Sequence, residues 1–320
     1  MLFVVAGCTS NQNPQLTRTP HAPGVDLYVQ GSEQLDEGKV DEAVATLASA
    51  IQVNPNLIMP RSLLGDIYRS RNQYALAADQ YQALTQLDPY ASDNYYYLGL
   101  CYQFLDRLKD SVATYLRALH LNPADAKSNM NLGLAYLALG KPDDAVRYIE
   151  KSTQLDPNSA AGWANLGVAY DACGEPLKAE NAYRRSLELD SNQAATMENL
   201  GANLIQQGKT SAAIAILQEA IKRQDSAFAH KLLGDAYTMA KRDDDAVAQY
   251  QEAVRVDPNY TAGLNALASA MIAKYEAGSE LDDSLRRTAV SSWKKSLAFK
   301  PQQPQIAELV QKWDKQSAPK

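Results

Sequence analysis

The sequence predicts an all-α repeat protein, and three observations support this fold class. Glycines stand 34 residues apart at six successive places, from Gly31 to Gly201, and Gly234 follows after 33 residues. Prolines share this period from Pro55 to Pro157. The composition has 49 alanines and four phenylalanines, which favours helices over β-branched strands. We therefore expect one elongated array of similar units rather than the two globular domains that 320 residues would suggest.

Each unit contains two amphipathic segments separated by a short break. In the fifth unit, residues 163–174 place apolar side chains at helical spacing, Gly174-Glu175-Pro176 marks a turn, and residues 177–189 form a second helical pattern. A proline in the first turn of a helix costs little, because its nitrogen has no helical partner there. Prolines at the unit ends stop the second helix. Each unit is thus predicted to be a helical hairpin.

The repeated glycine falls in the middle of the first helix, where it costs about 1 kcal/mol relative to alanine. We expect close approach of the second helix to offset this cost, with a small residue facing each glycine. The expected small partners are Ala43, Ala77, Ala145, Ala179, Ala213 and Ala246, and the tyrosines expected in the adjacent gap are Tyr68, Tyr102, Tyr136, Tyr170 and Tyr237.

These residues resemble the tetratricopeptide repeat (TPR) pattern, a 34-residue helix–turn–helix with Trp, Leu-Gly, Tyr, Ala and Pro at fixed offsets. The best copy has Trp163, Leu166, Gly167, Tyr170, Ala179 and Tyr183, and departs from the pattern at Ser186 and Ser191. The resemblance implies a right-handed superhelical solenoid of about eight repeats. The repeats are expected at 24–57, 58–91, 92–125, 126–159, 160–193, 194–226, 227–260 and 261–303.

The two ends of the array depart from the pattern, as expected where a repeat lacks a neighbour. The first unit has Gln30 and Gln34 at places that are apolar elsewhere. The eighth unit carries an insertion at residues 277–284 between its helices. Residues 304–320 are predicted to be a capping helix and a tail. The residues of this helix expected to cover the last hairpin are Ile306, Leu309, Val310 and Trp313.

Residues 1–8 read MLFVVAGC, and small residues before Cys8 after an apolar run resemble the lipobox of bacterial lipoprotein signal peptides. Seven residues precede Cys8 and none is charged, whereas a secretory signal has a basic start and a longer apolar region. We interpret residues 1–8 as the remnant of such a signal and 9–23 as a flexible linker. The resemblance implies a lipid on Cys8 and a place at the bacterial outer membrane, facing the periplasm. The alternative is a chance match in a cytoplasmic protein.

Charge and motifs argue against several classes of function. The net charge of -6 and a pI of about 5.2 argue against a broad surface that binds nucleic acid. From residue 284 onward, however, eight basic residues stand against two acidic ones. Cys8, Cys101 and Cys173 have no metal-ligand spacing, and no phosphate loop or hydrolase motif occurs. We therefore predict no catalytic residue, no metal, no cofactor and no enzyme activity.

The TPR resemblance implies a concave groove, built from the first helices, that binds peptide segments of partner proteins. An apolar strip is expected at Tyr96, Leu100, Met130, Leu134 and Leu137. Polar flanks are expected at Asp66 and Arg69 on one side and at Asp171, Glu198, Lys231 and Asp235 on the other, with Asn131, Asn165 and Asn199 placed to bond a peptide backbone. The alternative is that the strip packs against a neighbouring hairpin and that the asparagines merely belong to the fold.

The sequence thus predicts a non-enzymatic scaffold that binds protein segments. With its lipobox-like start, it resembles the pilus-assembly lipoproteins of type IV and tight-adherence systems. Two alternatives remain: a cytosolic TPR scaffold or regulator, and an adaptor for an envelope enzyme or for outer-membrane protein insertion.

Overall fold

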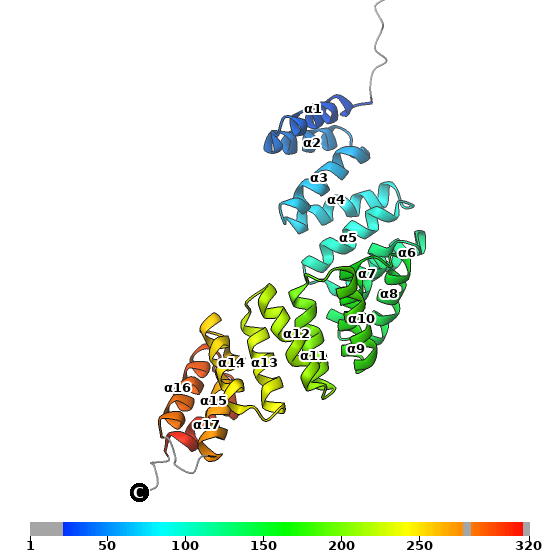
Figure 1. The fold of residues 1–320 in the computed structure, drawn as a ribbon. Coiled ribbons are helices and arrows are strands. Elements are labelled where there is room, and N and C mark those ends of the chain that lie inside the picture. The colour runs from blue at the N-terminus through cyan, green and yellow to red at the C-terminus, as the bar shows by residue number, and fades with distance from the viewer. Residues whose placement is uncertain (1–21, 278–282, 316–320) are drawn as a thin grey trace, which may run out of the picture. The chain divides into compact units, whose positions relative to one another are not determined.

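The computed structural model describes residues 22–277 and 283–315, and in these ranges the chain forms seventeen α-helices and no strand (Figure 1). This confirms the all-α prediction. The first sixteen helices pair in order as hairpins, and the last stands alone. They are α1 (Val25–Asp36), α2 (Val40–Val53), α3 (Ile58–Ser70), α4 (Tyr74–Leu87), α5 (Ser92–Phe104), α6 (Leu108–Leu121), α7 (Ala126–Ala138), α8 (Pro142–Leu155), α9 (Ala160–Ala172), α10 (Pro176–Leu189), α11 (Ala194–Gln206), α12 (Thr210–Arg223), α13 (Ala227–Met239), α14 (Asp243–Val256), α15 (Thr261–Ala277), α16 (Asp283–Phe299) and α17 (Pro304–Asp314).

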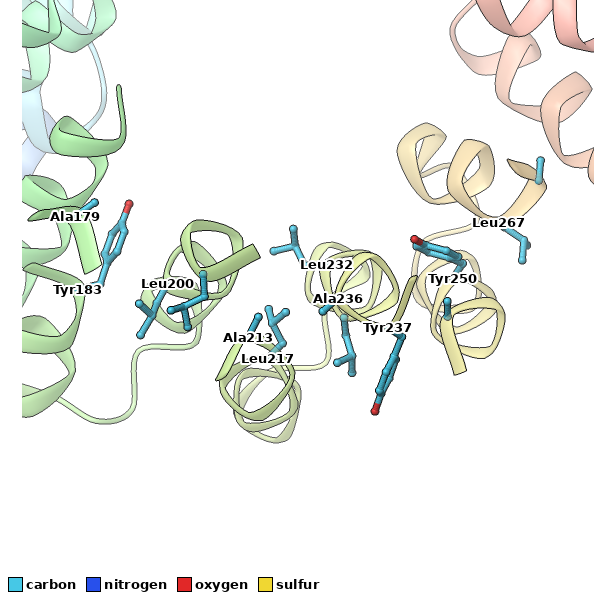
Figure 2. Close-up of a cluster of buried hydrophobic side chains, with 14 of the residues drawn as sticks. Ala179, Tyr183, Leu200, Ala213, Leu217, Leu232, Ala236, Tyr237, Tyr250 and Leu267 are labelled. Carbon is cyan, nitrogen blue, oxygen red and sulfur yellow. The ribbon is translucent and has the colours of Figure 1, made fainter. Parts of the chain in front are cut away.

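The chain divides into two compact units, residues 1–123 and 124–320, which we call the N-terminal and C-terminal units. The border lies between α6 and α7, between the third and fourth hairpins. The N-terminal unit has one apolar cluster around Leu47 and Leu64 and another around Tyr81 and Leu98. The C-terminal unit has a single cluster that runs from α8 to α17, part of which is drawn in Figure 2.

A left-handed residue closes the turn between the two helices of a hairpin. In the fifth repeat this residue is Gly174, with φ of 72°, where the absence of a side chain makes the conformation easy. The seventh repeat uses Lys241 at the same place, with φ of 57°. Two second helices, α8 and α10, then begin with the predicted proline in their first turn.

A large side chain, and not the expected alanine, lies nearest to the place of the missing Cβ of each repeated glycine, although the backbone oxygen of Ala145 also lies 3.1 Å from that place at Gly133. A Cβ atom on Gly167 would lie 2.4 Å from Cε1 of Tyr183, and one on Gly201 would lie 2.5 Å from Cδ2 of Leu217. The predicted alanines are buried one helical turn earlier, as Figure 2 shows for Ala179 and Ala213. The glycine is needed because a ring or branched chain fills the space of its missing Cβ. The other pairs are Gly31–Leu47, Gly65–Tyr81, Gly99–Tyr115, Gly133–Ile149 and Gly234–Tyr250.

The tyrosines expected beside the glycines lie at the edge of the core under basic side chains. Tyr102, Tyr170 and Tyr237 are buried, while Tyr68 and Tyr136 are half-buried. The guanidinium of Arg107 lies 4.2 Å from the ring centre of Tyr102, and that of Arg242 lies 4.4 Å from the ring centre of Tyr237. In such cation–π contacts the guanidinium is attracted to the face of the ring.

The eighth hairpin has longer helices than the others, because α15 continues to Ala277 and α16 begins at Asp283. The ends of the predicted insertion therefore belong to helices, and residues 278–282 lie outside the described residues. A helix, α17, lies where the sequence predicts the capping helix. Its Trp313 is 5% exposed and meets the ring of Tyr275 edge-on at 6.0 Å.

The hydrogen bonds that position α17 match those that join two ordinary repeats. Ahead of α11, Nε2 of Gln193 donates to Oγ of Ser186 at 3.0 Å. Ahead of α17, Nε2 of Gln303 donates to Oγ of Ser296 at 3.1 Å, and both serines are fully buried. Helix α17 therefore occupies the place of the first helix of a further repeat.

Candidate functional site

The first helices of the hairpins in the C-terminal unit lie next to one another. Helix α9 contacts α7 and α11, and α13 contacts α11 and α15, so these five helices form one wall. At its C-terminal end, between α13 and α15, lies a groove of about 450 Å³. Lys231, Asp235 and Thr238 of α13 line one side of the groove, and Ala262, Ala266 and Ala270 of α15 line the other.

The groove exists because α15 presents small side chains to it. Besides the three alanines, Ser269 and Ala273 line the groove, and both are exposed. A helix face of this kind leaves room for another chain to approach its backbone closely. The opposite side is polar, because Nζ of Lys231 lies 2.6 Å from Oδ2 of Asp235. The groove thus combines a shallow apolar surface with one ion pair at its edge.

Two of the predicted site residues, Lys231 and Asp235, lie in this groove, whereas its alanines were not predicted. The sequence predicts large apolar side chains as anchors on the first helices. Alanine gives no such signal, because it is frequent on every face of these hairpins. A usable signal was the crowding of small residues in α15, where residues 266–270 read ALASA.

Three of the predicted groove acids hold tyrosines of the core. The hydroxyls of Tyr81 and Tyr183 donate to Asp66 and Asp171 at 2.8 Å. The hydroxyl of Tyr250 donates to Asp235 at 2.9 Å. In the third repeat the amide oxygen of Gln103 replaces the carboxylate and accepts from Tyr115 at 3.1 Å. Each of these tyrosine rings also packs against the repeat's glycine.

The second, third, fifth and seventh repeats, which we call the tyrosine repeats, share this arrangement. The first, fourth and sixth repeats, which we call the aliphatic repeats, have Leu47, Ile149 and Leu217 against the glycine. A branched aliphatic chain has no hydroxyl to satisfy, and the matching places on the first helix are then mostly apolar. These places, one and four residues after the glycine, hold Ser32 and Leu35, Leu134 and Leu137, and Ala202 and Ile205.

The apolar strip predicted in the fourth repeat therefore belongs to an aliphatic repeat. Met130, Leu134 and Leu137 are half-buried and pack against the core of the C-terminal unit. Their contacts agree with the alternative interpretation, in which the strip takes part in hairpin packing. Their exposed portions still face away from the core.

Burial decides the electrostatics of Asp171 and its partner. It raises the pKa of Asp171, and hydrogen bonds from Tyr183 and Asn203 act in the opposite direction. Burial and the neighbouring carboxylate also raise the pKa of Tyr183. The tyrosine therefore stays a hydroxyl donor across the physiological pH range, and Asp171 serves as its acceptor.

The other predicted site residues of the N-terminal unit form contacts around Tyr97. Nη2 of Arg69 donates to Asp66 at 3.0 Å, and the Arg69 guanidinium lies 4.9 Å from the ring centre of Tyr97. Tyr96 is half-buried, with its ring centre 5.1 Å from that of Tyr97. Leu100 is also half-buried.

The remaining predicted site residues of the C-terminal unit are half-buried along α7, α9 and α11. Nδ2 of Asn165 lies 3.6 Å from the sulfur of Met130, and Glu198 accepts a hydrogen bond from Ser226. Asn131 and Asn199 occupy the matching places in their helices. Cys8 lies outside the described residues.

Neither a metal site nor a membrane-spanning helix is found in the part of the chain that the structure describes. Within residues 22–277 and 283–315, no three potential ligands among His, Cys, Asp and Glu gather closely enough to hold a metal ion. No helix in these ranges has both the length and the apolar character needed to cross a bilayer.

Comparison with known proteins identifies the repeat. Residues 60–271 match the family model of the cilia and flagella-associated protein 70 C-terminal domain, a domain of tetratricopeptide repeats. In sequence, 80 residues are 32% identical to the general transcriptional corepressor ssn6 of Schizosaccharomyces pombe, and 83 residues are 28% identical to the corepressor trfA of Dictyostelium discoideum. These alignments cover 25% and 26% of this chain but span 7% and 6% of the two relatives.

Solved structures share the fold at low sequence identity. The Cut9–Hcn1 assembly of the APC/C matches 85% of this chain and 52% of its own, with a TM-score of 0.60 and 16% identity. YrrB, described as a TPR protein with an unusual peptide-binding site, matches 59% of this chain and 98% of its own, with a TM-score of 0.52 and 19% identity. The pilF protein of Pseudomonas aeruginosa matches 63% and 93%, with a TM-score of 0.55 and 19% identity.

Proposed function

We propose that this chain, which belongs to the tetratricopeptide repeat family of the cilia and flagella-associated protein 70 C-terminal domain, is a non-enzymatic scaffold that binds segments of partner proteins. The groove between α13 and α15 carries this proposal. It lies on the wall of first helices, with Tyr250 of α14 also lining it, and small side chains of α15 leave it open. YrrB, with its reported peptide-binding site, offers a precedent for a peptide bound to this fold.

The chemistry of the groove favours an extended segment with small or apolar side chains. Ala266 and Ala270 allow the segment to approach α15 closely, and burial of its apolar atoms contributes about 25 cal/mol per Å². Thr238 and the Lys231–Asp235 pair provide hydrogen-bonding groups for its backbone. Specificity then depends on few polar groups, as in most peptide grooves.

The test is a selection from a displayed random peptide library, followed by affinity measurement of the enriched peptides by fluorescence anisotropy. Ser269→Trp places an indole in the groove at an exposed position and is expected to weaken binding about tenfold or more. Ser211→Trp, on an exposed position of α12, is the matched control and is expected to leave binding unchanged. Equal binding by all three proteins would contradict the groove assignment.

Met130, Leu134 and Leu137, the half-buried strip residues of the C-terminal unit, extend the proposed partner surface beyond this groove. Leu134→Ala together with Leu137→Ala, both on α7, is expected to reduce binding of a longer partner segment while circular dichroism and the melting temperature stay unchanged. A loss of stability instead of binding would assign both side chains to hairpin packing.

We further propose that the scaffold is anchored by lipid on Cys8 at the periplasmic side of a bacterial outer membrane and serves pilus or secretion machinery. The sequence VAGC supports this proposal, and the alternatives remain a cytoplasmic scaffold, or an adaptor for an envelope enzyme or outer-membrane protein insertion. Metabolic labelling with radioactive palmitate tests the anchor, with Cys8→Ala as the control. Absence of label on the wild-type chain would exclude lipidation.

A further inference from the structure

The two ends of the repeat order carry opposite charge. Within residues 22–57, which hold α1 and α2, six acidic residues stand against one basic residue. Within residues 283–315, which hold α16 and α17, seven basic residues stand against three acidic ones. A chain with a net charge of -6 thus has one end that is more acidic than the whole and one that is basic.

Two acidic residues of α1 and the acidic residue at its C-cap share one side of the helix. Asp26, Glu33 and Glu37 are seven and four residues apart, a spacing that places them along one stripe, and all three are exposed. Asp26 and Glu33 form no ion pair among the described residues, while Glu37 pairs with Lys39 at 2.9 Å. Val29, an apolar side chain that is 46% exposed, adjoins this stripe.

The basic charges of α16 are arranged in the same manner. Arg287 and Lys294 are seven residues apart, Lys295 follows, and all three are exposed, with Arg287 paired to Asp283 at 3.3 Å. Lys294 pairs with Asp314 of α17 at 2.8 Å, and Lys295 forms no ion pair within the described ranges. Phe299, which is 48% exposed, lies one helical turn beyond Lys295.

We infer that the acidic face of α1, formed by Asp26, Glu33 and Glu37, docks against the basic face of α16, formed by Arg287, Lys294 and Lys295, in a second copy of this chain. The two faces are opposite in sign, and each includes one exposed apolar residue. Their lengths also agree, since Asp26 to Glu37 and Arg287 to Phe299 span about 16 and 18 Å at 1.5 Å per residue.

This head-to-tail contact uses two different surfaces, so each bound copy still presents one free acidic and one free basic end. A heterologous contact of this kind continues into an open chain unless its rotation closes a ring. The contact involves neither the groove of α13 and α15 nor Cys8. Failure of the proposed function would therefore not contradict this contact, and failure of the contact would not contradict the proposed function.

Sedimentation velocity of the full chain at increasing protein concentration tests the inference. At low salt we expect the average mass to rise with concentration, and we expect the association constant to fall about tenfold or more when salt is raised to several hundred millimolar. Asp26→Lys with Glu33→Lys, or Arg287→Glu with Lys295→Glu, is expected to weaken association by at least about tenfold, since each brings like charges together. Both pairs leave the Lys294–Asp314 contact intact.

A mixture of the two charge-reversal variants, Asp26→Lys/Glu33→Lys and Arg287→Glu/Lys295→Glu, provides the decisive measurement of association. Each alone has two ends of one sign, whereas a mixture again offers opposite ends, so association is expected to return. Lys127→Glu with Lys151→Glu, on exposed positions of α7 and α8, makes the same change in net charge as Arg287→Glu with Lys295→Glu and is expected to associate like the wild type. Circular dichroism and melting establish that every variant is folded.

Three results would overturn the inference. The first is a wild-type chain that stays monomeric at about 100 μM and low salt. The second is association that both reversed variants retain. The third is binding of the basic face to vesicles of anionic phospholipid by a chain that shows no self-association, which would assign that face to a membrane instead.

Discussion

In the fifth repeat, Tyr183 packs its ring on Gly167 and donates its hydroxyl to Asp171, whereas in the fourth repeat Ile149 packs on Gly133 and the place of Asp171 holds Leu137. The backbone is the same in both hairpins, so one side chain of the second helix accounts for the difference. A tyrosine needs an acceptor at its far end, and that acceptor must come from the first helix. The packing of the core therefore decides where the wall of first helices is polar and where it is apolar.

Moving a tyrosine into an aliphatic repeat should break this relation most severely. Ile149→Tyr enlarges a fully buried side chain and leaves its hydroxyl facing Leu134 and Leu137, so we expect a loss of about 2–5 kcal/mol in the free energy of unfolding. Urea denaturation followed by circular dichroism measures it. Adding Leu137→Asp supplies the acceptor found in the fifth repeat and should recover part of the loss. A double mutant less stable than additivity predicts would refute the relation.

The reverse exchange should cost less. Tyr183→Leu keeps an apolar group on Gly167 but removes one of the two donors to Asp171, leaving Asn203, for an expected loss of about 1–3 kcal/mol. Tyr183→Leu with Asp171→Leu turns the fifth repeat into an aliphatic one and should be more stable than Tyr183→Leu alone. The coupling energy from the double-mutant cycle is the readout, and a value near zero would show that the two side chains act separately.

Replacement of the repeated glycine by alanine should destabilise both kinds of repeat. Gly167→Ala and Gly201→Ala each gain helix propensity of about 1 kcal/mol, but the new Cβ forces a buried ring or leucine to move, at a cost of about 1–3 kcal/mol. We expect a net loss in both. The loss should be larger at Gly167, because the ring of Tyr183 is rigid. Thermal unfolding compares the two, and a stabilised Gly167→Ala protein would show that the ring has room.

The smallest expected effect is a pH dependence that comes from Asp171 in the fifth repeat. The pKa of Asp171 is raised above its ordinary value of 3.8, so the folded chain binds its proton more tightly than the unfolded chain does. The contribution of Asp171 to stability therefore falls as pH rises from 3.8 through its folded pKa and is constant above it. Asp171→Asn should remove this slope from urea-denaturation curves collected between pH 4 and 6. An unchanged slope would mean that its pKa is not raised.

Most of the fold could be predicted from the sequence, because a 34-residue period constrains every hairpin at once. Glycine and proline are conspicuous in a sequence, and their places identified the hairpins and the capping helix. What each glycine faces was beyond the sequence pattern: Ala179 and Tyr183 are four residues apart on one helix, and only their positions against α9 show which of them meets Gly167.

The site was harder to predict than the fold, for a physical reason. Asp66, Asp171 and Asp235 are polar residues on the first helices, which is what a binding surface requires, yet each also satisfies a tyrosine of the core. The groove, in turn, depends on the small size of Ala266 and Ala270. No residue type in the sequence marks a space that side chains leave empty.

The hydrogen bonds from Gln303 to Ser296 place α17 where the next repeat would start. A further hairpin can be inserted at such a junction. A hairpin from the middle of this array that is preceded by a glutamine can form the same hydrogen bond with Ser296 of α16. Arrays of this type can therefore be lengthened by inserting whole hairpins before α17, without redesign of the terminal surface.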